Sequence, residues 1–162
     1  MNYEELFAQT ALNSWKLVLD GLEKTFASLS DDDLQKEVAP GRNRIYYLLG
    51  HLTAVHDRLL PMLFLGERLH PELDEPFLTS PDRAHPDPVA ATELRSAWSA
   101  VNGKLAEGFA TLAAEDWLKR HTAVSEEDFA REPHRNRLAV LLSRTAHAAF
   151  HSGQIVLALE RK

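Results

Sequence analysis

Apolar residues recur at three- and four-residue steps along most of the chain, the spacing that gathers them on one face of a helix. The first such series lies before residue 30 and consists of Leu6, Ala8, Leu12, Trp15, Leu19, Leu22 and Phe26. No segment shows the period-two alternation of a half-buried strand. The pattern therefore predicts an all-α fold with long helices over residues 4–29, 43–65, 89–114 and 134–159, and a short helical turn near residues 30–34.

Prolines divide this pattern. Pro61 falls inside the second predicted helix and should kink it, and Pro133 should occupy the first turn of the fourth. Residues 66–88 contain Pro71, Pro76, Pro81, Pro86 and Pro88, so we expect no helix there. This stretch is either a crossover that lets helices two and three run parallel, or a lid over a site. The acidic run at residues 126–128 is expected to lie in a solvated loop over residues 115–132.

Length and charge narrow the classes of protein. At 162 residues the chain is the size of one domain, which we place at residues 1–162. It carries 18 basic and 24 acidic side chains, a net charge of −6, and its cations are scattered, so we expect no nucleic-acid partner. The sequence starts without a signal-peptide pattern and has no apolar run of membrane-spanning length. We therefore expect a cytoplasmic protein without membrane contact.

Histidine dominates the candidate chemistry, because the chain has eight histidines and no cysteine. His147 and His151 are four residues apart in the fourth predicted helix, where their imidazoles would lie on one face and could reach one metal ion. No glutamate follows His147, so this is not the metalloprotease helix motif. A third ligand has to come from another helix.

The surroundings of these histidines leave two alternatives open. Their face of the helix, which also holds Arg144 and Gln154, is either a solvated surface or the lining of a polar cavity or dimer contact. On the second predicted helix, His51 and His56 are the candidate partners. Five residues separate them, so they point about 140° apart and are unsuited to one ion together. His56 falls on the leucine stripe, as a core histidine would, and His51 lies on the flank with Tyr47 and Arg58.

Two short motifs resemble the DinB-like superfamily. One is Leu49-Gly50-His51-Leu52, and the other, more specific, is His147-x-x-x-His151-Ser152-Gly153-Gln154-Ile155. The resemblance covers nearly the whole chain through the order of the helices and the long second connection. It implies a four-helix bundle of up-down-down-up arrangement, often a homodimer. It also implies a divalent metal, usually zinc, nickel or iron, held by His51, His147 and His151.

The resemblance also implies a function. Members of the superfamily include transferases and isomerases that use low-molecular-weight thiols, so a small thiol is an expected cofactor or co-substrate. Helix two of the family often carries an acid five residues after its histidine, where this chain has His56. We consider His56, Tyr47, Arg58, Arg144 and Gln154 as residues that support the metal ligands or orient a substrate.

Three functions follow as hypotheses. The first is a divalent-metal-dependent enzyme with a three-histidine site, a thiol S-transferase or a hydrolase that acts on a small-molecule substrate. The second is a non-catalytic, stress-associated metal-binding protein that forms a homodimeric bundle. The third is a histidine-rich surface with no metal function. Convergence of the three imidazoles on one point would separate the first two from the third.

Overall fold

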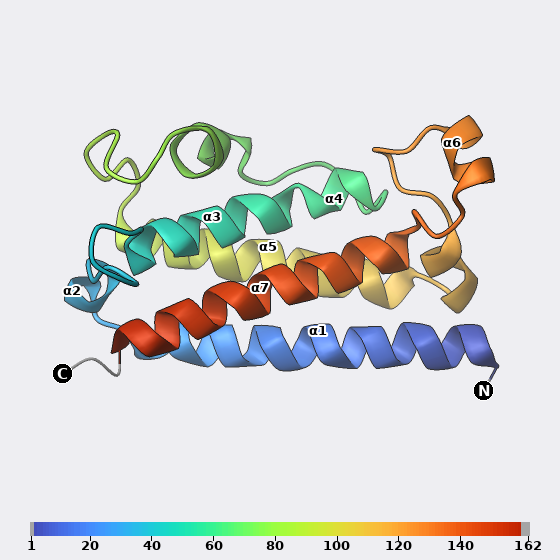
Figure 1. Ribbon diagram of the computed structural model, residues 1–162, viewed down its shortest axis with the longest axis horizontal. Coiled ribbons are helices and arrows are strands. Elements are labelled where there is room, and N and C mark those ends of the chain that lie inside the picture. The colour runs from blue at the N-terminus through green and yellow to red at the C-terminus, as the bar shows by residue number, and fades with distance from the viewer. Residues whose placement is uncertain (1, 160–162) are drawn as a thin grey trace.

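The computed structural model describes residues 2–159, and every regular element in that range is helical. Four long helices account for most of it: α1 (Tyr3–Ser28), α3 (Ile45–Asp57), α5 (Ala91–Thr111) and α7 (Arg137–Leu159). Figure 1 shows α3 and α5 starting from one end of the molecule, and α1 and α7 starting from the other. Helix α1 packs mainly against α7, and α3 packs mainly against α5. The predicted all-α class is confirmed.

Helix α1 begins where its sequence provides a cap. The Asn2 side chain accepts a hydrogen bond from the Glu5 backbone N–H (2.8 Å), and the Glu5 carboxylate accepts one from the Asn2 N–H (2.9 Å). This reciprocal pair satisfies two backbone donors that a helix otherwise leaves open. Ser30 and Asp33 repeat the device at α2 (Asp31–Leu34), the short turn that the sequence predicts.

The helix predicted over residues 43–65 is divided in two. Helix α3 ends at Asp57, and α4 (Leu59–Met62) follows after Arg58. Pro61 has no backbone N–H to donate to the Asp57 carbonyl, so the hydrogen-bond ladder is interrupted at this point. The predicted kink is therefore a break between two helices.

The proline-rich segment contains more structure than the sequence predicts. A 3₁₀ turn, η1 (Pro71–Leu73), and a π-helical turn, η2 (Glu75–Thr79), lie within residues 66–88, so the expectation that no helix forms there is wrong for these two short stretches. In each of them a proline stands at one of the first positions, where its missing N–H costs no internal bond. Both turns pack on α3 (Figure 1).

Two further expectations about loops require correction. Residues 115–132 include the end of η3 (Ala114–Leu118) and α6 (Glu126–Arg131), so the acidic run forms the first turn of a short helix, capped by Ser125. Acidic side chains suit that position because a helix N-terminus carries partial positive charge. Pro133 precedes α7 by four residues rather than standing in its first turn. The Asn136 side chain accepts from the Ala139 N–H (2.9 Å) and caps the helix instead.

The buried apolar residues form two clusters at opposite ends of the long helices. One surrounds Phe26, Ile45 and Trp98, and the other surrounds Trp15, Leu60 and Phe109. His56 contacts both, because its ring lies against Trp15 (centroids 4.9 Å apart) and Trp98 (5.3 Å). None of the helices within residues 2–159 is long and apolar enough to cross a membrane.

Candidate metal centre

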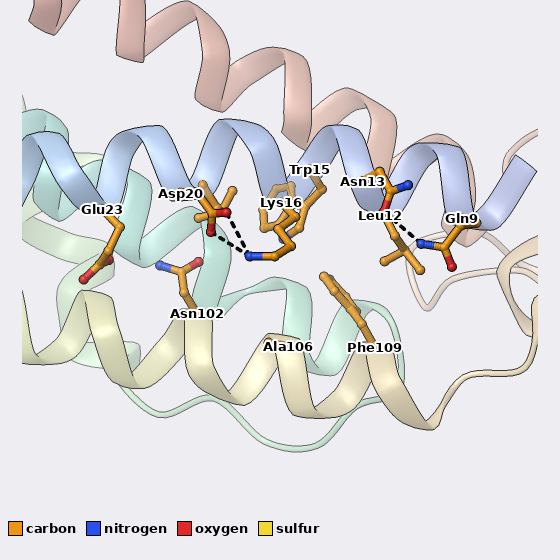
Figure 2. Close-up of a pocket in the computed structure, with 11 residues that line it drawn as sticks. Gln9, Leu12, Asn13, Trp15, Lys16, Asp20, Glu23, Asn102, Ala106 and Phe109 are labelled. Carbon is orange, nitrogen blue, oxygen red and sulfur yellow. Dashed lines mark hydrogen bonds and ion pairs between the residues drawn. The ribbon is translucent and has the colours of Figure 1, made fainter.

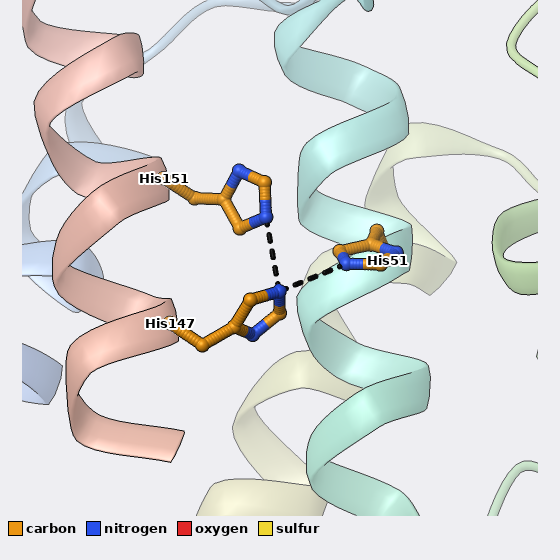
Figure 3. Close-up of side chains that lie close together, drawn as sticks. All are labelled: His51, His147 and His151. Carbon is orange, nitrogen blue, oxygen red and sulfur yellow. Dashed lines mark hydrogen bonds between the residues drawn. The ribbon is translucent and has the colours of Figure 1, made fainter. Parts of the chain in front are cut away.

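Three histidine side chains from two helices meet at one point. His51 projects from the middle of α3, and His147 and His151 project from successive turns of α7 toward it (Figure 3). The Nε2 atom of His147 lies 3.2 Å from that of His51 and 3.1 Å from that of His151. All three side chains are half-buried. The face of α7 that bears the two histidines is therefore turned toward α3.

Hydrogen bonds on the far side of two of these rings set the tautomer. His51 Nδ1 lies 3.0 Å from the Phe77 carbonyl oxygen, which can only accept, so the ring proton sits on Nδ1. His151 Nδ1 donates in the same way to Gln154 Oε1 at 2.8 Å. Both rings then present an unprotonated Nε2, the metal-ligating form, to the centre of the group.

The third ring, His147, differs from the other two. Its Nε2 faces both neighbours, while its Nδ1 is buried and has no hydrogen-bond partner within the described residues. A single N–H on His147 Nε2 could donate to only one of the two acceptor nitrogens beside it. The arrangement therefore brings lone pairs together at one point, and a cation there would satisfy all three.

The two nitrogen–nitrogen distances from His147 match a metal site. Three imidazole nitrogens held about 2.05 Å from a tetrahedral ion lie about 3.3 Å from one another. The observed separations of 3.2 and 3.1 Å are close to that value. Because all three ligands are neutral nitrogen donors, the set suits zinc, nickel or iron better than magnesium or calcium, which prefer oxygen.

The protein environment favours the neutral form of each ring. Burial lowers the pKa of His51 and of His151, against the opposing effect of their hydrogen bonds to Phe77 and Gln154. Burial, followed by the nearby His151 and His51 rings, lowers the pKa of His147 to about 4. Neutral imidazole is the form that binds a metal, so no proton has to leave before binding near pH 7.

Gly50 lies directly against the ring of Phe77, the residue whose carbonyl contacts His51. A Cβ atom at this position would lie 2.5 Å from Phe77 Cγ, where ordinary contact begins at 3.4 Å. The absence of a side chain lets η2 approach α3 closely enough for the Phe77 carbonyl to reach the His51 ring. No sequence motif pointed to Phe77, and the one available signal was a glycine inside a helix beside a predicted ligand.

His56 is not part of the metal-ligand group and lies in the core. It is fully buried, and its Nδ1 lies 2.8 Å from Asn102 Oδ1. Asn102 Nδ2 donates to the Trp98 carbonyl, which orients the amide so that its oxygen accepts from His56. The opposite nitrogen, His56 Nε2, has no partner within the described residues. Burial is the largest cause that lowers the pKa of His56 to about 4.

The other residues singled out from the sequence occupy different surroundings. The Tyr47 ring stacks on His51 (centroids 6.3 Å apart), and its hydroxyl donates to the Ser80 carbonyl. Arg144 precedes His147 by one turn, and its charge helps to lower the pKa of His51 and His147. Arg58 is 51% exposed along its side chain and pairs with Asp74 of the proline-rich segment.

A cleft between α1 and α5 is another place where a ligand could lie (Figure 2). It has a volume of about 400 Å³, and Trp15 and Phe109 form part of its apolar wall. Its polar rim is already paired internally, by the Lys16–Asp20 ion pair and by the hydrogen bond from Gln9 to Asn13. No group on this wall is arranged for metal binding, so the three histidines remain the candidate centre.

Comparison with known proteins gives one clear result. No curated protein matches the chain significantly. The family model described as the DinB superfamily matches residues 14–155. That range includes His51, His147 and His151 and the helices that carry them. The chain belongs to the DinB superfamily.

Proposed function

We propose that this protein is a divalent-metal-dependent enzyme that acts on a small molecule, either as a thiol S-transferase or as a hydrolase. The observation that carries the proposal is the convergence of three imidazole nitrogens within 4.8 Å of one another, two pairs of which lie at metal-ligand separations. Membership of the DinB superfamily supports it. Catalytic metal sites commonly use three protein ligands and leave a position open to water or substrate, whereas structural sites use four.

The residues of the chain have distinct tasks in this proposal. His51, His147 and His151 would hold the ion, and Phe77 and Gln154 keep two of the rings in the ligating tautomer and orientation. A bound divalent metal supplies a Lewis acid that activates a thiol or a water molecule. Since the chain has no cysteine, a reacting thiol must be a diffusible small molecule.

We also propose that α1, α3, α5 and α7 form a four-helix bundle of up-down-down-up arrangement. The helix directions in Figure 1 support this arrangement. In it, the segment between α4 and α5 is a crossover that returns the chain to the end where α3 began. The Phe77 carbonyl belongs to this crossover, so the connection also supports the proposed site.

Metal binding is the first test. The purified protein should bind about one equivalent of Zn²⁺ or Ni²⁺, measured by elemental analysis and by competition with a chromophoric chelator. His147→Ala should weaken binding by more than a hundredfold. His134→Ala is the matched control, because His134 is exposed and lies outside the cluster. Equal affinity in the His147→Ala variant and the parent would show that the ligand assignment is wrong.

Activity is the second test. The loaded protein should accelerate the conjugation of a small thiol with an electrophile, or the hydrolysis of an activated ester. His147→Ala should abolish that acceleration, and His134→Ala should retain it. A protein that binds metal with high affinity but accelerates neither reaction would favour the non-catalytic alternative.

That alternative, a metal-stabilised homodimer, has one observation of its own. The outer face of α7 exposes Leu142, Phe150 and Leu157, which are 50%, 63% and 58% accessible. Small exposed residues lie between them on the same helix, which allows a second helix to approach closely. Sedimentation equilibrium would show a dimer that Phe150→Glu converts to a folded monomer. A monomeric parent protein would exclude this interface.

A further inference from the structure

A second cleft opens directly beside the histidine cluster. It has a volume of about 550 Å³, within the usual range of small-molecule sites. Its walls come from the loop before α3 and from the later turns of α7, and include Arg42, Asn43, Leu48, His151, Gln154 and Leu157. His151 therefore belongs both to the proposed metal site and to the wall of this cleft. A molecule in the cleft would have one end next to the cluster.

The charge of this cleft is unlike that of the protein as a whole. The chain has a net charge of −6, yet no carboxylate within residues 2–159 lines the cleft. The guanidinium of Arg42 has no ion pair among the described residues. Glu37, the acid of the same loop, is already committed to Arg83 and to the Gly41 N–H. Within the described part of the chain, the cleft wall thus presents a cation without a counterion.

Arg44 shows that the lack of an ion pair at Arg42 is not shared by the other arginine next to it in the same loop. Two residues after Arg42, Arg44 is buried and pairs with Asp82 (2.6 Å) and Asp87 (2.8 Å). The residues that the structure describes therefore supply carboxylates to Arg44 and none to Arg42. Among them, nothing competes with a ligand for the Arg42 guanidinium.

Hydrogen-bond donors accompany the cation. The side-chain amide of Asn43 makes no hydrogen bond to another described residue. Gln154 uses its oxygen to accept from His151, which leaves its NH₂ group as a donor on the cleft wall. A guanidinium and two amide groups form a donor set that suits a carboxylate, which arginine binds in a planar, bidentate geometry.

We propose that this cleft binds the carboxylate end of the small-molecule substrate or co-substrate, with Arg42 as its ion-pairing residue and Asn43 and Gln154 as donors. The other end of the molecule reaches the histidine cluster. That second statement rests on the proposed function. A divalent ion with three neutral ligands retains its full charge, so an anionic ligand is also the one that the centre would favour.

A pair of probe thiols tests this assignment. 3-Mercaptopropionate and 2-mercaptoethanol carry the same thiol and differ in whether the other end is a carboxylate or a hydroxyl. Affinities for the Co²⁺-loaded protein would be measured from the change in visible absorption. We expect the parent to prefer 3-mercaptopropionate by about fivefold, the scale of a partly exposed ion pair. Arg42→Ala should remove this preference and leave the affinities for Co²⁺ and 2-mercaptoethanol unchanged.

Arg131→Ala is the matched control, since it removes the same charge from α6, outside the cleft. A preference that survives in Arg42→Ala, or no preference in the parent, would overturn the assignment. If neither thiol perturbs the Co²⁺ spectrum, the proposed thiol chemistry fails. Carboxylate binding in the cleft is then tested without the metal. In that case 3-mercaptopropionate should still shift the Asn43 and Gln154 side-chain amide signals of the metal-free protein in NMR spectra. The absence of those shifts, or their persistence in Arg42→Ala, would overturn the proposal for the cleft as well.

Discussion

Replacing Gly50 by alanine should disturb both the core and the histidine cluster. The added methyl group would lie 2.5 Å from Phe77 Cγ, about 1 Å closer than ordinary contact allows. Phe77 cannot easily retreat, because its side chain is buried and its ring packs on Tyr46 (centroids 5.7 Å apart) and Tyr47 (5.9 Å). The backbone of η2 must then shift away from α3, and the Phe77 carbonyl moves with it.

Two opposing terms set the size of the effect on stability. Overpacking a buried site typically costs about 1–3 kcal/mol, and the rigid, enclosed ring at Phe77 places this case at the upper end. The higher helix propensity of alanine over glycine stabilises the folded protein by about 1 kcal/mol. We therefore expect Gly50→Ala to lower the free energy of unfolding by about 2 kcal/mol. Loss of the hydrogen bond that orients His51 should weaken metal binding by about tenfold, a usual cost for removing a ligand's supporting partner.

Gly103→Ala is the matched control, because a Cβ atom at Gly103 in α5 would meet nothing within 4 Å. It should stabilise the protein by about 1 kcal/mol and leave metal affinity unchanged. Urea unfolding of the metal-free proteins measures the first quantity, and chelator competition measures the second. A Gly50→Ala variant as stable as Gly103→Ala, with parental metal affinity, would refute the proposed role of the close approach between α3 and η2.

Three further predictions concern charge and protonation. Arg44→Ala leaves Asp82 buried without its cation and should lower the free energy of unfolding by about 3–5 kcal/mol in urea titrations; a loss below 1 kcal/mol would contradict this. Metal affinity should be nearly constant from pH 8 to about 6.5 and fall at lower pH, because the lowered pKa values keep all three rings neutral until then. A loss of metal affinity already above pH 6.5, measured by chelator competition, would contradict this. The pKa of His56 in the folded protein, about 4, lies below the ordinary histidine value of 6.5. The unfolded chain therefore binds a proton that the folded chain does not, and stability falls as the pH drops from 6.5 to 4. His56→Gln should remove a loss of about 3 kcal/mol over that window, and identical pH profiles of unfolding for the variant and the parent would show that His56 is not held neutral.

The helices were largely predictable because each depends on local sequence. Apolar spacing and the caps at residues 2 and 30 act within one or two turns, and the observed ends of α1 differ from the prediction by one residue. The break at Arg58 was predicted only as a kink, since a single proline permits either outcome. The turns η1 and η2 form against α3, so their stability comes from tertiary packing that local propensity does not contain.

The candidate site was predictable in part. Two histidines four residues apart imply a shared face. For the third position, periodicity favoured a core role for His56, but composition alone did not choose between His51 and His56. The structure separates them: His56 points into the core between Trp15 and Trp98, and His51 faces α7. The role of Phe77 had only the indirect signal of Gly50 beside a predicted ligand, because Phe77 acts through its backbone carbonyl. The proposed role of Arg42 had none, because it depends on the absence of a partner among the described residues.

The ligands of the proposed site are far apart along the chain, and this has a consequence for the unfolded state. His51 and His147 are 96 residues apart in sequence. A metal ion that joins them closes a loop of that length, as a disulfide would. By the chain-entropy model, a permanent link across such a loop stabilises the folded state by roughly 5 kcal/mol. A chain without cysteine would thereby gain a cross-link that is set by metal supply rather than by redox conditions.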